Sequence, residues 1–277
     1  MKPALSSLIG VVILIVALAG TAAAEGLPDV LGIQLGMPAR EAHAKLQGQF
    51  PKNNLQVMST NLPTIEKPVM TSFQSTPKQT LAMGDEGDIV TVDVTLPPNK
   101  QAVWRVHREH FFPDKGIPTK TLLASLREKY GKESRAIASN GKETTTDESK
   151  IVALLWLMDE QGRPATRPAL VGMTDPLSSC KGYTEGAGFD AGLVESPPPT
   201  TFMSAENKWC LSNFTAVNVM FMDSQVPELY SRMIIGVVSV PFARRAGEAT
   251  MKWKQEIAEG QHKQDLQKAK QLEKPKL

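Results

Sequence analysis

The chain has 277 residues, and its 31 Lys and Arg residues against 29 Asp and Glu residues give a formal net charge of +2. This near balance excludes a strongly basic nucleic-acid-binding protein. Hydrophobic residues make up 41% of the chain and charged residues 22%, which is typical of a globular protein with a buried core.

The first 24 residues have the pattern of a secretory signal peptide. Lys2 precedes the apolar run 8–18, and residues 20–24 are the small residues that signal peptidase accepts. The run is shorter than the ~20 residues that span a bilayer, so cleavage after Ala24 is favoured over an uncleaved anchor. We therefore expect an exported protein, either periplasmic or secreted.

The first expected unit, residues 27–112, opens with a short strand and a helix. Residues 30–35 are mostly apolar and predict the strand, and Pro38 suits a first helical turn because its missing N–H is not needed there. Apolar residues then recur every four positions, as one face of an amphipathic helix requires. These residues are Ala42, Leu46 and Phe50.

A β-hairpin completes this unit. Residues 89–96 alternate apolar and polar side chains, which predicts a strand with one buried and one solvated face. A turn and a return strand over 101–112 follow. Within the return strand, His107 and His110 are three residues apart, so their side chains should point to opposite faces. We interpret them as an exposed histidine pair rather than as metal ligands.

A second helix-plus-sheet unit is expected over residues 113–223, because the Pro-initiated helix pattern reappears at Pro118. Strands are predicted over 151–158 and 214–222. The repetition suggests an internal duplication, and the alternative is a chance match between two amphipathic helices. The second helical stripe consists of Leu122, Leu126 and Tyr130.

Cys180 and Cys210 are the two cysteines of the chain. In an exported protein an even, low cysteine count is typical of a structural disulfide, and the spacing of a reactive Cys-x-x-Cys pair is absent. The segment between them is rich in Gly and Pro and has little regular structure of its own. We expect a Cys180–Cys210 disulfide.

Residues 224–277 are expected to form C-terminal helices and a basic tail. The apolar residues from 229 to 237 predict one helix that Pro241 should break or kink. A second helix is predicted to carry an apolar stripe and to fray beyond Gly260. Packing of this helix on the domain is favoured over binding to a membrane surface, because its apolar face is mostly Ala. The stripe consists of Phe242, Ala246, Ala249, Trp253 and Ile257.

No pattern in the sequence assigns a catalytic residue, a cofactor site or a metal site. The Gly-x-Ser-x-Gly motif of serine hydrolases and the paired-histidine motifs of zinc peptidases are absent. Gly186 and Gly188 do not complete a dinucleotide-binding loop, since neither a preceding strand nor a following helix is predicted. We therefore expect a protein that is not an enzyme.

Two segments carry a resemblance to known proteins. Residues 31–38 followed by Glu41 and Ala42 are similar to the start of uncharacterised secreted proteobacterial proteins, and residues 126–131 ahead of the strand at Ile151 resemble the same group. More distantly, the pattern resembles helix-on-sheet domains of β-lactamase-inhibitor-like proteins and outer-membrane-assembly lipoproteins. The resemblance implies helices on an antiparallel sheet, sometimes in tandem, that hold protein partners. This chain differs in having no lipid-anchor Cys and a long basic C-terminal helix.

Together these patterns predict an α+β protein with helices packed on antiparallel sheet. The favoured function is a non-catalytic binding protein whose partner is another envelope or secreted protein, without nucleic acid or cofactor. Two alternatives are an envelope enzyme of hydrolase type with a dispersed site and a membrane-peripheral factor that acts through the basic C-terminal helix.

Overall fold

The computed structural model describes most of the chain between residues 26 and 271. The described ranges are 26–62, 65–79, 81, 85–139, 144, 148–164, 214–223, 226 and 228–271. The expected signal peptide and both cysteines, Cys180 and Cys210, therefore lie outside the described residues. Export and the disulfide stay predictions.

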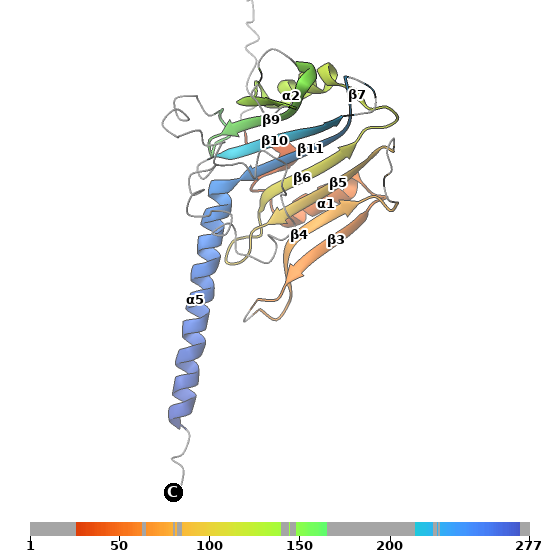
Figure 1. Cartoon of the computed structure of the whole chain (residues 1–277). Coiled ribbons are helices and arrows are strands. Elements are labelled where there is room, and N and C mark those ends of the chain that lie inside the picture. Colours follow the sequence, from red (N-terminus) through yellow and green to blue (C-terminus); the bar gives the residue numbers. More distant parts are fainter. Residues whose placement is uncertain are drawn as a thin grey trace, which may run out of the picture.

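The fold is α+β, as expected, and most of its strands form one antiparallel sheet (Figure 1). A small hairpin and a helix come first: β1 (Asp29–Val30), β2 (Ile33–Gln34) and α1 (Ala39–Gln49). Four strands follow: β3 (Asn54–Thr60), β4 (Val69–Thr76), β5 (Gly87–Val94) and β6 (Val103–Phe111).

The second half of the chain also places a helix before four strands, but a single short strand replaces the first hairpin and a long helix follows. After β7 (Ile117–Pro118) come α2 (Thr119–Tyr130), β8 (Arg135–Ala138), the 3₁₀ turn Glu148–Lys150 and β9 (Ile151–Met158). The last elements are β10 (Thr215–Asp223), β11 (Leu229–Ser239) and α5 (Val240–Gln271).

The strand order of the large sheet is β3-β4-β5-β6-β11-β10-β9-β8, with β7 also paired to β11. The helices α1 and α2 are therefore each followed by four strands, and these four lie side by side in the sheet in the order in which they occur along the chain. The last strand of each set, β6 and β11, meet as an antiparallel pair at the centre of the sheet. This arrangement agrees with the expected internal duplication, which itself stays a prediction.

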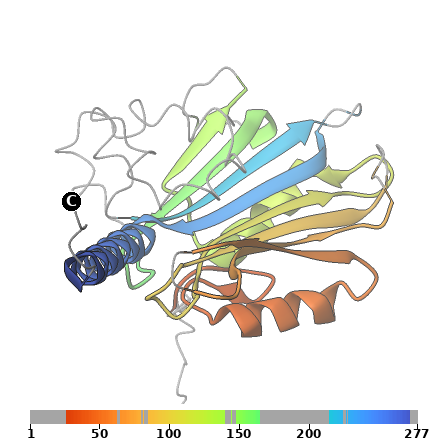
Figure 2. The ribbon, with the colours of Figure 1, turned by 90° about the horizontal axis from the view of Figure 1, so that it is seen from below.

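Both helices pack on the same face of the sheet. One row of directly opposite residues crosses six strands, so its side chains share a face. At one end of the row the Phe73 ring lies 5.3 Å from the ring of His43 on α1, and at the other end Trp156 lies 5.5 Å from Tyr130 on α2. Figure 2 shows α1 below the sheet. The row is Phe73, Val92, Val106, Val237, Val217 and Trp156.

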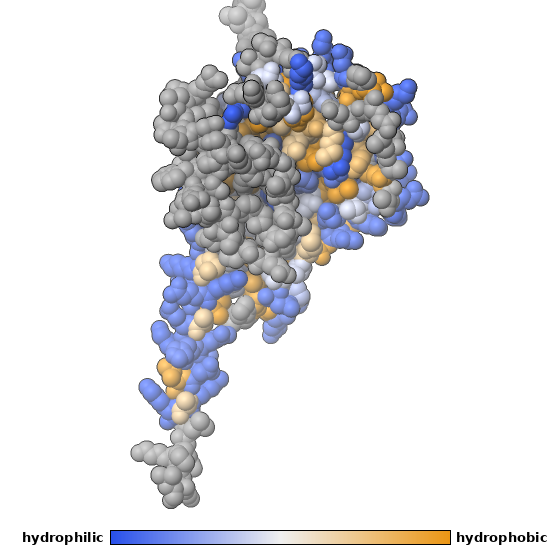
Figure 3. Space-filling view, viewed as in Figure 1, coloured by the Kyte–Doolittle hydropathy of each residue, from blue (hydrophilic) through white to orange (hydrophobic). Residues whose placement is uncertain are grey.

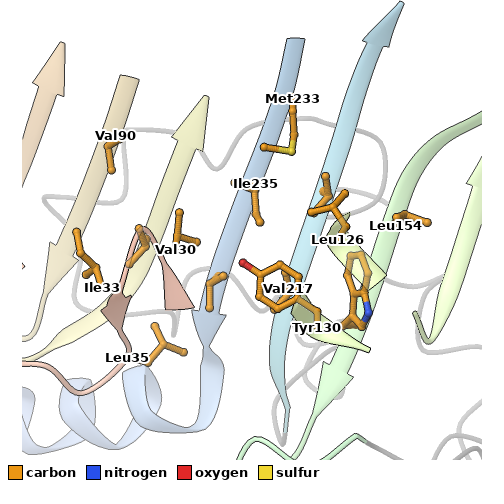
Figure 4. Packing of buried hydrophobic residues seen from close by; sticks show 14 of the residues in the cluster. Val30, Ile33, Leu35, Val90, Leu126, Tyr130, Leu154, Val217, Met233 and Ile235 are labelled. Atoms are coloured by element: carbon orange, nitrogen blue, oxygen red, sulfur yellow. The ribbon is translucent and has the colours of Figure 1, made fainter. Parts of the chain in front are cut away.

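The core fills the space between this face, the two helices and the β1–β2 hairpin (Figure 4). The Trp156 indole N–H donates a hydrogen bond to the carbonyl of Gly131, at 2.8 Å. The Tyr130 hydroxyl donates to the carbonyl of Asp29, at 2.7 Å. These two bonds satisfy polar groups at the edge of the core and fix the end of α2 against β9 and β1.

The helix expected at residues 229–237 is wrong, because this segment is strand β11. It lies between β6 and β10, its residues on the helix side belong to the core, and residues on the opposite side such as Ile234 and Val238 are apolar too, so the apolar run is nearly continuous. Such a run has no period that distinguishes a buried strand from a buried helix. The β-branched residues Ile234, Ile235, Val237 and Val238 favour the strand. The second set of strands thus extends past 223 to Ser239.

One long helix, α5, replaces the predicted break at Pro241 and the predicted fraying beyond Gly260. Pro241 lies in its first turn, where proline is tolerated. Ala246 and Thr250 are buried against the domain, and the Asn99 side chain of the β5–β6 turn donates to the Ala246 carbonyl at 2.9 Å. Trp253 is only half-buried, and α5 projects from the domain beyond it (Figure 1). None of the described helices is both long and apolar enough to cross a membrane.

Candidate binding surface on the distal sheet face

The face of the large sheet that points away from α1 and α2 is called the distal face. Successive side chains of a strand point to opposite faces, so the distal face carries the residues directly before and after each residue of the core-facing row. Across β4, β5 and β6, the residues Gln74, Thr91 and His107 are opposite neighbours, and the Gln74 amide donates to the Thr91 hydroxyl at 3.0 Å. The same row continues on β11 and β10 through Gly236 and Asn218. The distal face therefore has a polar band through its centre.

A buried ion pair lies beside this band. Asp93 and Arg105 are opposite neighbours on β5 and β6, and the Arg105 guanidinium donates a hydrogen bond to the Asp93 carboxylate. Both side chains are no more than 5% exposed. Burial raises the pKa of the Asp93 carboxyl more than Arg105 lowers it. The desolvation of this carboxylate therefore opposes its attraction to Arg105.

A second ion pair links the two halves of the sheet. Glu109 on β6 and Arg232 on β11 are joined at 2.6 Å, and both side chains are partly buried. The Arg232 guanidinium also lies 5.1 Å from the centre of the Phe111 ring, within the range of a cation–π contact. Arg105 and Arg232 thus both have a carboxylate from a neighbouring strand as countercharge.

Apolar side chains surround the second ion pair. Ile89 and Phe111 come from β5 and β6, Ile234 from β11, and Met220 and Met222 from β10. Met222 is 40% exposed and the other four are intermediate in exposure. Figure 3 shows this face, with hydrophobic and hydrophilic residues side by side over the strands. A mixture of large apolar groups, an aromatic ring and an arginine is typical of protein-binding surfaces.

The prediction that His107 and His110 point to opposite faces is confirmed by the strand register, but their predicted exposure is wrong. His107 lies on the distal face, half-buried between β5 and β11. His110 lies on the helix side with its side chain 15% exposed, and its Nδ1 is 3.0 Å from the Asp88 carboxylate. β6 lies between β5 and β11, so side chains of two neighbouring strands flank each ring, and the sequence predicted only the β5 neighbour.

His107 has a pKa lowered from 6.5 to about 4, first because burial disfavours the charged ring and then because Arg105 and Arg232 repel it. Above pH 6.5 the ring is neutral in both the folded and the unfolded chain, and the free energy of unfolding does not depend on its titration. As the pH falls from 6.5 toward 4, the unfolded chain binds a proton that the folded chain does not, so the free energy of unfolding decreases. Between about pH 7.5 and about pH 5, the free energy of unfolding should fall by about 2 kcal/mol more in the parent than in His107→Gln.

Urea unfolding at the two pH values measures this difference. The comparison variant is His262→Gln, which makes the same substitution at an exposed histidine on α5, outside the sheet. An equal loss of stability on acidification in His107→Gln and the parent would show that His107 titrates alike in the folded and unfolded states.

The sequence assigned no catalytic, cofactor or metal-binding residue, and in the described part of the chain no group of three or more His, Cys, Asp or Glu residues is placed to hold a metal ion. Sequence reasoning missed the Glu109–Arg232 pair and Met222. Arg232 lay in a segment predicted as helix, so its partner on β6 could not be recognised. The β-branched residues at 234–238 are the signal that could have revealed the strand.

Comparison of the chain with protein-family models, with curated proteins and with solved structures found no match.

Proposed function

We propose that this chain is a non-catalytic exported binding protein, and that its distal face holds another envelope or secreted protein. The observation that carries the proposal is the group of half-exposed apolar side chains around the Glu109–Arg232 pair. These side chains stand on central strands whose other face is fixed by the core. A partner would therefore meet a surface that needs little ordering on binding.

The charges of this surface favour a partner with apolar and neutral polar groups. The two arginines have countercharges within the sheet, and His107 is neutral near pH 7 because of its lowered pKa. Long-range attraction to a charged partner is therefore weak, and binding should depend little on salt. Contact energy should come mainly from Phe111, Met222 and their apolar neighbours.

Capture from the native envelope fraction tests this proposal. The double variant Phe111→Ala/Met222→Ala should bind the captured protein about 30-fold or more less tightly than the parent, because truncation of central apolar residues at an interface costs about 1 kcal/mol or more each. Binding is quantified by mass spectrometry of the captured protein after washes at low and at high salt.

The matched control is Met251→Ala/Leu266→Ala, which removes two exposed apolar side chains from α5. It should bind like the parent. If this control loses the captured protein while the distal-face variant keeps it, the contact surface is α5 and the proposal is wrong. Circular dichroism and urea unfolding of both variants establish that each is folded.

A further inference from the structure

The two edges of the large sheet differ in how they are protected. Strand β3 forms one edge (Figure 1), and β8, next to β9, forms the other. An edge strand presents backbone N–H and C=O groups that another strand can pair with. Proteins usually block such an edge with a short strand, charged residues, proline, a bulge or a covering segment.

The edge strand β8 has several of these features. It has four residues, and Arg135 supplies a charge. The backbone N–H of Thr144 donates to the carbonyl of Ala136 at 2.9 Å, so a residue outside the sheet already takes one of its backbone groups. A second sheet could pair with β8 only after displacing this contact.

The edge strand β3 lacks most of them. Its seven residues, Asn54–Thr60, include no charged residue and no proline. A register irregularity at Met58 and Ser59 is its one protective feature among the described residues. Val57, on the helix side of the strand, is 49% exposed although it is opposite the fully buried Phe73 of β4. An exposed β-branched residue in an uncharged edge strand is suited to strand pairing.

We infer that two copies of the chain associate through β3, as an antiparallel strand pair that joins their sheets. In a pair centred on Val57, each Val57 side chain lies opposite the same residue of the second copy. Gln56 then lies opposite Met58 of that copy. A two-fold pairing sets each strand against itself, so a charged residue near the centre would meet a like charge. The uncharged sequence of β3 removes this obstacle.

The same contrast explains why association would stop at two copies. A chain with two open edges could add copies at both ends and form a long assembly. Here Thr144 already contacts β8, and the backbone groups of the two β3 edges are bonded to each other in the pair. The product is a closed dimer. This inference is separate from the proposed function, because Val57 does not lie on the distal face.

Sedimentation equilibrium of the purified protein tests the inference. The parent should be a dimer at micromolar concentration. Val57→Lys and Val57→Glu should each raise the dimer dissociation constant about ten-fold or more, since each places like charges opposite one another. An equimolar mixture of the two variants should recover association, because the opposite charges then pair.

The control Met222→Lys places the same charge on the distal face and should dimerise like the parent. The inference is overturned if the parent is monomeric up to about 100 µM, or if Val57→Lys dimerises as tightly as the parent. It is also overturned if the mixture of Lys and Glu variants associates no better than either variant alone, because direct opposition of the two residues requires that recovery. Since Val57 is half-exposed, circular dichroism should show that both variants are folded.

Discussion

Replacing Trp156 with alanine should lower the free energy of unfolding by about 3–5 kcal/mol. The side chain is 2% exposed and is the largest of the fully buried side chains in the described part of the chain. Its removal leaves a cavity between α2 and β9, and it leaves the carbonyl of Gly131 without the indole donor at 2.8 Å. The cavity and the lost hydrogen bond act in the same direction. Urea unfolding followed by circular dichroism measures the change.

The matched control is Trp253→Ala on α5. The helical stripe predicted from the sequence includes Trp253, but the structure leaves this side chain half-buried. Its replacement should cost about 1 kcal/mol, as is common outside a core. Equal losses for the two variants would contradict the placement of Trp156 in the core and of Trp253 at its margin.

The second large effect is expected at the buried ion pair of the distal face. Asp93→Asn keeps the size of the side chain but removes the countercharge next to Arg105. The variant should be about 3–5 kcal/mol less stable than the parent, because a buried charge without compensation carries its full desolvation cost. Asp159→Asn is the control. It changes an ion pair with Arg163 that is largely exposed, and it should cost about 1 kcal/mol or less.

A double variant separates the cost of breaking the pair from the net worth of the pair. In Asp93→Leu/Arg105→Met both charges are replaced by apolar groups of similar length. Its stability should be close to that of the parent or higher, because desolvation of the pair offsets most of its attraction. If the double variant is as unstable as Asp93→Asn, then contacts other than the charge pair hold this part of the sheet.

Local patterns predicted the elements with clear periodicity. The alternation at residues 89–96 identified β5, and the spacing of Ala42 and Leu46 identified the buried side of α1. The match between Pro38 and Pro118 identified the start of both helices, each of which begins at the next residue. One side of each helix faces water, so the period survives in the sequence. The polar side of β5 was predicted to be solvated, and this is wrong for Asp93, which is buried in the ion pair with Arg105.

The centre of the sheet and the distal face could not be predicted in this way. β11 is largely apolar on both faces, and Pro241 just after its end suggested a broken helix rather than the first turn of a new one. The ion pair Glu109–Arg232 joins residues that are far apart in the chain and depends on the register of β6 with β11. Strand register between distant segments is fixed by packing and not by local composition.

The meeting of β6 and β11 at the centre of the sheet has a consequence for how the protein folds. Val106 pairs with Val237, so the middle of the sheet closes only when nearly the whole domain has left the ribosome. Until then, β6 is an edge with core residues beside it. Contacts so distant in sequence slow folding and leave the chain open to aggregation while they are missing. A chain that ends before Leu229 would have two further open edges, at β6 and at β10, in addition to β3, and should depend on chaperones to remain soluble.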